Sequence, residues 1–238
     1  MADQSAEEAK KQYIEKMGKP LGTQFHALWQ EVALLHVNWK EYVTLFGTNE
    51  RRIERLNKSA PAFFRMIQDQ LWTATLLHIA RLLDPPRTAG KANLTVRNFT
   101  DLVDEKLKMP LAVLIDKALK ETEFARDWRN RVIAHQDLSI ALKEGTAEAL
   151  EPASRTDVNT ALAALTNVMN AIEKFYLNSG TAFSAAARHN GALTLLYLLG
   201  DGLKAKSERE EGLEQALSDG ADENLKQALG ANDFQEEI

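Results

Sequence analysis

The chain of 238 residues contains no cysteine, which excludes both disulfide bonds and thiolate metal sites. A lack of cysteine is typical of proteins that fold in a reducing compartment. The sequence also lacks any run of about 18 consecutive apolar residues, which a helix needs to cross a bilayer. Its beginning, MADQSAEEAKKQY, has no apolar segment of the kind found in signal peptides. We therefore expect a cytoplasmic protein that makes no use of a membrane.

The motifs of several familiar enzymes are absent as well. There is no glycine-rich phosphate loop, no nucleophile elbow and no His-Glu-x-x-His zinc motif. We expect neither a metal nor a cofactor, because the five histidines are scattered and do not occur with acidic partners at metal-binding spacing. His78 falls among the apolar positions of a predicted helix, where a hydrogen-bonded core histidine is the more common case. The histidines are His26, His36, His78, His135 and His189.

Positive charge is scarce overall, since 34 acidic residues outweigh 29 basic ones and give a formal net charge of -5. This balance argues against a general nucleic-acid coat protein. The charge is unevenly distributed, because residues 201–238 hold 11 acidic and 4 basic side chains. The remaining 23 acidic and 25 basic residues leave positions 1–200 near +2. The acidity therefore belongs to the C-terminal end.

What the sequence does contain is a helical pattern of apolar residues at three- and four-residue steps, without any alternating strand pattern or repeat. Glycine at position 47 and prolines at 85 and 86 mark the ends of the first two long helices. The pattern predicts an all-α fold, an antiparallel helical bundle with extra C-terminal helices. The predicted helices cover residues 25–46, 50–57, 61–84, 95–107, 110–119, 122–142, 158–175 and a short buried segment, 192–199.

These helices and the charge distribution predict three regions along the chain. Residues 1–20 form a polar N-terminal leader, and residues 21–200 form the helical domain. Residues 201–238 form an acidic, weakly helical tail, whose only regular apolar positions are leucines. We expect the tail to dock weakly, or to dock on a partner.

The predicted helix over residues 122–142 carries Arg126, Arg129 and Arg131, followed by His135. On a regular helix Arg131 and His135 share a face, whereas Arg129 lies about 120° around the helix from His135. A second copy of the helix across a two-fold axis would close that gap. Histidine exchanges a proton near neutral pH and arginine binds phosphate oxygens, so these residues suit phosphodiester chemistry without a metal.

Two simpler interpretations of this segment remain open. The arginines can form a solvated face, with His135 pairing with Asp137 at the end of the helix. Trp128 can stack on a base, but its spacing from Phe124 and Val132 favours packing in the core.

The order Arg129, Asn130 and then His135 resembles the motif of HEPN domains, in which an arginine and a polar neighbour precede a histidine by a short, variable number of residues. Earlier blocks resemble the abortive-infection, AbiU2-like branch of that superfamily, so that the resemblance covers roughly residues 25–140. Those blocks are Trp39-Lys-Glu-Tyr42, Leu45-Phe-Gly47, Ala62-Phe-Phe64, Ile79-Ala-Arg-Leu-Leu-Asp84 and Asn93-Leu-Thr95.

The resemblance implies a HEPN-type bundle that forms a homodimer and, in active members, a metal-independent endoribonuclease that leaves a 2′,3′-cyclic phosphate and a 5′-hydroxyl. His135 would act as general base or acid, and Arg129 would hold the scissile phosphate. Asn130 would orient the histidine or a phosphate oxygen. The implied partners are RNA as substrate, a second copy of the chain and an antitoxin or other protein, in a toxin-like role in phage defence.

Four further residues are candidates for RNA binding or for supporting the site: Arg126, Arg131, Asp84 and Asp137. Each can equally form a structural salt bridge. The alternative function is a non-catalytic HEPN-like module that binds a nucleotide or a protein, because one fold hosts active and inactive members. A helical transcription factor is disfavoured, since no short helix-turn-helix with a basic recognition helix is visible.

Overall fold

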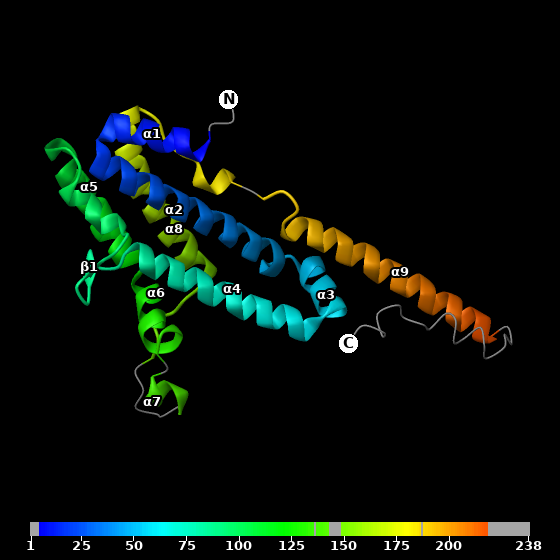
Figure 1. Ribbon diagram of the computed structural model, residues 1–238. Coiled ribbons are helices and arrows are strands. Elements are labelled where there is room, and N and C mark those ends of the chain that lie inside the picture. The colour runs from blue at the N-terminus through cyan, green and yellow to red at the C-terminus, as the bar shows by residue number, and fades with distance from the viewer. Residues whose placement is uncertain (1–4, 136, 143–148, 187, 219–238) are drawn as a thin grey trace. The chain divides into compact units, whose positions relative to one another are not determined.

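The computed structural model describes residues 5–135, 137–142, 149–186 and 188–218, and these residues are mainly helical (Figure 1). They confirm the predicted all-α class, to which one minor hairpin is added. The chain divides into two compact units, which are described separately below. The first unit comprises Met1–Tyr42 and Ile67–Arg188, and the second comprises Val43–Met66 and His189–Ile238.

The elements follow one another along the chain in the order expected for a helical protein. They are α1 (Ala6–Met17), α2 (Lys19–Phe46), α3 (Glu50–Ser59), α4 (Pro61–Leu82), β1 (Arg87–Thr88), β2 (Lys91–Ala92), the 3₁₀ helix η1 (Val96–Asp101), α5 (Glu105–Glu121), α6 (Glu123–Trp128), the π-helical turn η2 (Arg129–Ile133), α7 (Leu138–Ala141), α8 (Arg155–Leu177), the 3₁₀ helix η3 (Phe183–Ala185) and α9 (Ala192–Ser218).

The core of the first unit lies between α2, α5 and α8. Helices α5 and α8 pack along each other, and α2 lies beside α8 (Figure 1). Phe25 and Phe99 are completely buried in this core and their ring centroids lie 6.1 Å apart. At the polar edge of the same interface, Trp39 Nε1 donates to Asn159 Oδ1 at 2.7 Å. Burying each large apolar side chain contributes roughly 1.5–3 kcal/mol, so this interface dominates the stability of the unit.

Local signals explain where the helices of the first unit begin and end. Helix α1 begins with a capping box between Ser5 and Glu8, and α8 begins with another between Ser154 and Asp157. Helix α8 ends where Asn178 adopts the left-handed conformation, with φ of 51°. The predicted ends of the first long helix at position 47 and of the second before the two prolines are likewise found.

A hairpin follows the second long helix at the segment that the sequence predicts as a loop. Strands β1 and β2 pair antiparallel. The turn between them needs positive φ at Gly90, where φ is 80°. Asn93 Nδ2 closes the base of the hairpin by donating to Pro85 O at 2.7 Å and to Thr88 Oγ1 at 2.8 Å. The hairpin therefore fixes the backbone that leaves α4.

Two predicted boundaries between the hairpin and the arginine segment are wrong. Thr95 does begin a helix, and its side chain accepts from Arg97 N at 3.3 Å, but the helix is the short 3₁₀ helix η1. The next helix does not restart at Pro110, because α5 already begins at Glu105 and includes the proline. A proline near the first turn removes few helical hydrogen bonds, which explains why the helix tolerates it.

In the second unit, α3 and α9 pack on each other. Leu56 of α3 and Leu196 of α9 are buried, with exposed fractions of 2% each. The predicted buried helix at 192–199 is wrong in its burial, since Tyr197 and Leu198 are each 64% exposed. Helix α9 also continues through residue 200, where the sequence places the start of the tail. Residues 219–238 of the predicted tail lie outside the described residues.

No helix in the described part of the chain is both long enough and apolar enough to span a membrane.

Candidate functional site: an arginine cluster beside a wide helical turn

The segment around the arginines is not the single helix that the sequence predicts over residues 122–142. Helix α6 gives way after Trp128 to the wide turn η2, and the helical path stops at Ile133. In the wide turn Ala134 N donates to Arg129 O at 2.8 Å, which spans five residues instead of four. The short helix α7 then starts separately.

The wide turn changes where the residues after it lie. One extra residue in a turn breaks the regular 100° step of an α-helix, so faces counted from the sequence no longer apply beyond Arg129. His135 lies in the bend after the turn and its side chain is exposed. The bend is held by Asp137 N, which donates to Arg131 O at 2.9 Å.

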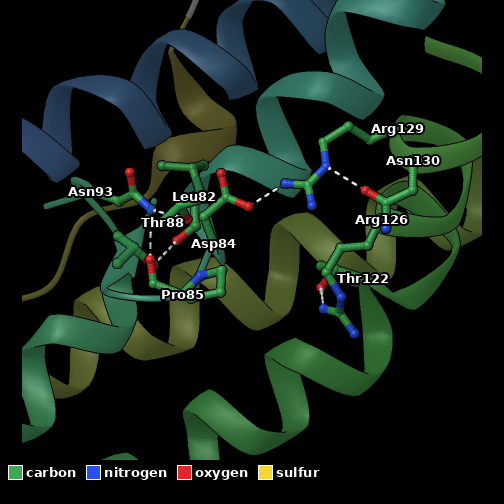
Figure 2. Close-up of polar contacts among 10 residues, drawn as sticks. Leu82, Asp84, Pro85, Thr88, Asn93, Thr122, Arg126, Arg129 and Asn130 are labelled. Atoms are coloured by element: carbon green, nitrogen blue, oxygen red, sulfur yellow. Dashed lines mark hydrogen bonds and ion pairs between the residues drawn. The ribbon is translucent and has the colours of Figure 1, made fainter. Parts of the chain in front are cut away.

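Arg129 is fixed by two partners. Its Nη1 forms an ion pair with Asp84 Oδ1, and its Nε donates to Asn130 Oδ1 at 3.0 Å (Figure 2). The side chains of Arg129 and Asp84 are each only 22% exposed. Because Asp84 immediately precedes the two prolines of the hairpin, the hairpin indirectly positions the guanidinium group. Asn130, which is exposed, orients this arginine.

Arg129 belongs to a group of three guanidinium groups, Arg97, Arg126 and Arg129, which we name the arginine cluster. Burial lowers the pKa of Arg126 from its ordinary value, and the nearby Glu123 carboxylate opposes that shift. The positive charges of Arg97 and Arg129 lower the pKa further. Arg126 Nη1 donates to Thr122 Oγ1 at 3.1 Å. All three arginines stay charged at neutral pH, so the cluster is a local concentration of positive charge that favours an anion.

Arg131 points to a different part of the first unit. Its Nη1 lies 3.6 Å from Asp127 Oδ1 and donates to Ala149 O at 3.2 Å. The same stretch of chain receives a bond from Trp128, whose Nε1 donates to Glu151 O at 2.9 Å. These contacts fasten the residues before α8 to α6, and they favour a structural role for Arg131.

Asp137 caps α7. Its Oδ1 accepts from Ser139 N at 3.0 Å, from Ser139 Oγ at 2.6 Å and from Ile140 N at 3.2 Å. The hydrogen bond from the Ser139 hydroxyl is the largest of the effects that hold the pKa of Asp137 below its ordinary value. Among the described residues, no ion pair joins Asp137 to His135, so the helix-end pair considered from the sequence does not form.

This combination of helical bundle, Arg-Asn pair and following histidine agrees with a comparison against protein families. The AbiU2 family model of HEPN domains matches residues 18–194, about three quarters of the chain. The chain belongs to the AbiU2 family of HEPN domains. The resemblance stated from the sequence is thereby confirmed, together with the HEPN-type fold and an association with abortive infection. Searches of curated proteins and of solved structures gave no significant match.

The structure of this HEPN domain brings together some of the predicted site residues and separates others. Arg129, Asn130 and Asp84 are in direct contact, and Arg126 lies beside them. His135 forms no hydrogen bond or ion pair with another described residue, including the motif arginine. Arg131 and Asp137 are engaged elsewhere, as described above.

Sequence reasoning missed two residues of this HEPN site. Arg97 comes from η1, and nothing in the local sequence indicates that it approaches α6. Asp127 was detectable, because it stands four residues before Arg131 and such pairs share a helix face. Trp128 is half-buried and bonded to the backbone of Glu151, an arrangement that fits neither base stacking nor a simple core position.

A polar hollow of about 240 Å³ lies next to the ion pair of Asp84. His78 and Glu31 line it, and His78 Nε2 lies 2.9 Å from Glu31 Oε2 without the angle of a hydrogen bond. Burial lowers the pKa of His78; the Glu31 carboxylate opposes this and Arg81 adds to it. Within the described ranges, no three His, Asp or Glu side chains gather as metal ligands.

Proposed function

We propose that this AbiU2-family protein is a metal-independent endoribonuclease that acts as a toxin-like effector. The observation that supports this most is the arginine cluster, in which three guanidinium groups from η1 and the α6–η2 segment approach one another with Asp84 as a counter-ion. Such a cluster binds a phosphodiester through planar pairs of hydrogen bonds. The exposed His135 follows it in the chain and is the residue suited to proton transfer.

The proposed reaction is a transesterification within RNA. The ribose 2′-oxygen bonds to phosphorus, and the bond from phosphorus to the 5′-oxygen breaks. A histidine takes the proton of the 2′-hydroxyl and an acid supplies a proton to the 5′-oxygen. Arg129 stabilises the charge that develops on the phosphate oxygens. Asn130 is a positioning residue, because its carbonyl oxygen holds the Nε of Arg129.

Two proton carriers are needed, one as base and one as acid, whereas each chain offers one motif histidine. A symmetric dimer supplies the second copy, since a two-fold axis brings identical patches together. We therefore propose that the active form is a homodimer with one composite cleft. Light scattering in solution measures this directly, and a strictly monomeric yet active protein would refute the composite site.

The test of cleavage compares the full chain with a His135→Ala variant. Both are incubated with total cellular RNA in EDTA, and the ends of the products are characterised. We expect the wild type to produce 2′,3′-cyclic phosphates and 5′-hydroxyls. Loss of a general acid-base histidine lowers the rate by about 10²–10⁴-fold, so the variant should be nearly inactive.

A His189→Ala variant, purified in the same way, is the matched control. This histidine is exposed and belongs to the second unit, so its removal should leave cleavage unchanged. Equal cleavage by all three proteins would identify a contaminating nuclease. No cleavage by any of them would refute the proposed nuclease.

One observation favours a second candidate function, a non-catalytic module that binds a nucleotide or a protein. Arg129 and Arg131 both have acidic partners, and an ion-paired arginine must exchange that partner for a phosphate. In this case the wild type binds RNA or a mononucleotide without cutting it, and His135→Ala leaves the affinity unchanged. The cleavage assay in EDTA, run beside a binding assay, separates the two functions.

A further inference from the structure

An open groove runs between α3 and α9 in the second unit, apart from the residues of the HEPN motif. Its volume is about 640 Å³. Apart from Leu203, its lining is polar, charged or glycine, and no aromatic side chain lines it. The lining residues are Arg51, Glu54, Arg55, Lys58, Gly200, Leu203, Lys204, Lys206, Ser207 and Glu210.

The groove has a surplus of positive charge, because five basic side chains face two acidic ones. Lys58 pairs with Glu54 at 2.8 Å and Lys206 with Glu210 at 3.7 Å. The side chains in these two pairs are 61–65% exposed, and exposed ion pairs contribute only about 0–1 kcal/mol. A polyanion can therefore displace them at little cost.

Arg55 forms a fixed part of the groove. Its Nη1 donates to Leu196 O at 2.6 Å, which uses one of the five donors of a guanidinium group. Gly200 lies directly against it, and a Cβ atom there would be 2.8 Å from Arg55 Cζ. The absent side chain gives the guanidinium group its place between the two helices.

Arg51 completes the positive side of the groove. It is exposed and has no hydrogen bond or ion pair with another described residue. An arginine without a partner keeps its full capacity for a phosphate. The groove thus combines one fixed guanidinium group with several exposed cations.

We propose that the groove between α3 and α9 binds the phosphate backbone of single-stranded RNA, a second contact that rests on RNA being the substrate. An open, cationic groove without aromatic side chains fits a repeating chain of phosphates better than a base or a compact apolar ligand. The contact is independent of sequence and raises the affinity for long RNA without taking part in the chemistry.

The test measures the binding of labelled oligo(U) to the full chain carrying His135→Ala, over a range of salt concentrations. The variant Arg51→Gln/Lys206→Gln removes two groove cations. Each phosphate contact with a single strand contributes about 0.7 to the slope of log affinity against log salt, so the slope should fall by roughly 1.4. A Lys11→Gln/Arg209→Gln variant is the matched control, since neither residue lines the groove and both are exposed.

An unchanged slope in the groove variant, or an equal fall in the control, would overturn the proposal. It would also fail if poly-glutamate competed with the wild type for a fluorescent label in the groove while oligo(U) did not, because the occupant would then be an acidic protein segment. Circular dichroism verifies that the variants are folded.

A dinucleotide substrate separates this proposal from the proposed nuclease. In a His135-containing background, the groove variant should cleave the dinucleotide at the wild-type rate, while its KM for long RNA rises and kcat stays the same. If no RNA is ever cleaved but the salt slope still falls, the nuclease is wrong and the groove stands. If cleavage is normal and the slope is unchanged, only the groove is wrong.

Discussion

In the first unit the arginines of the HEPN segment each have a fixed partner, whereas in the second unit the cations of α3 and α9 line an open groove. Arg129 is held by Asp84 and Asn130, while Arg51 has no partner among the described residues. Every shift of pKa that is caused chiefly by burial also lies in the first unit, at Tyr13, His36, His78 and Arg126; that of Tyr13 rises to about 12.

The difference separates two uses of positive charge. A guanidinium group with fixed partners has a defined direction, which transition-state stabilisation requires. Exposed cations lack a defined direction, but they attract a polyanion over distances of about 10 Å at ordinary salt. The comparison can be broken or sharpened by exchanging arginine for lysine in each region.

The largest expected effect is that of Arg129→Lys. Lysine keeps the charge but cannot form the planar fork with Asp84 or a phosphate, so cleavage should fall by about 10²-fold or more. Arg51→Lys should leave both cleavage and the salt slope unchanged, because a point charge suffices in the groove. Single-turnover cleavage and salt titrations measure both. If the two substitutions behave alike, the distinction between fixed and free arginines is wrong.

A middle-sized effect is expected in the pH dependence of stability. The pKa of His78 is lowered by burial despite Glu31, and that of His36 is lowered by burial beside Thr166. The folded state therefore favours the neutral rings. Their contribution is present above the ordinary histidine pKa of 6.5 and is lost as the pH falls below it, because the unfolded chain then binds protons more readily.

Denaturant unfolding at several pH values between 7.5 and 5, roughly one unit above and below the ordinary pKa, should show this loss. A His78→Gln variant should have a flatter profile than the wild type, whereas His189→Gln, at an exposed position, should have the wild-type profile. Identical profiles for His78→Gln and the wild type would contradict the stated role of burial at this position.

The smallest effect concerns Gly200→Ala. The new Cβ would press on the end of the Arg55 side chain, which can move, and alanine is favoured over glycine in a helix by about 1 kcal/mol. We expect a change of less than about 1 kcal/mol in the free energy of unfolding, with weaker binding of oligo(U). A loss of several kcal/mol in denaturant unfolding would mean that Arg55 serves the packing of α3 against α9 instead.

The sequence predicts the parts of this molecule that depend on local signals. Periodicity and the stop at Gly47 locate α2, and the two prolines locate the end of α4. The local cap of α8 at Ser154 and the i,i+4 pair Asp127–Arg131 follow the same rules. The family motif was recognisable because it is a local pattern.

The features that the sequence does not reveal depend on distant residues or on backbone geometry. Arg97 reaches the cluster from another element, and the partner of Arg129 lies 45 positions away in the chain. The apolar run before Gly200 was taken as buried, because composition does not say which neighbours cover a helix. The surplus of cations in the groove was hidden, since Lys204 and Lys206 belong to a segment that is acidic on average.

The wide turn at Arg129–Ile133 has a consequence for comparing this chain with others of its superfamily. An α-turn and a π-turn cover similar lengths of helix with different numbers of residues. A chain with one residue fewer between the arginine and the histidine can therefore carry its histidine to an equivalent place by closing the wide turn into an ordinary one. Insertions and deletions at this point change the count of letters in the motif while leaving its three-dimensional spacing intact, so alignments of the family should be gapped within the turn.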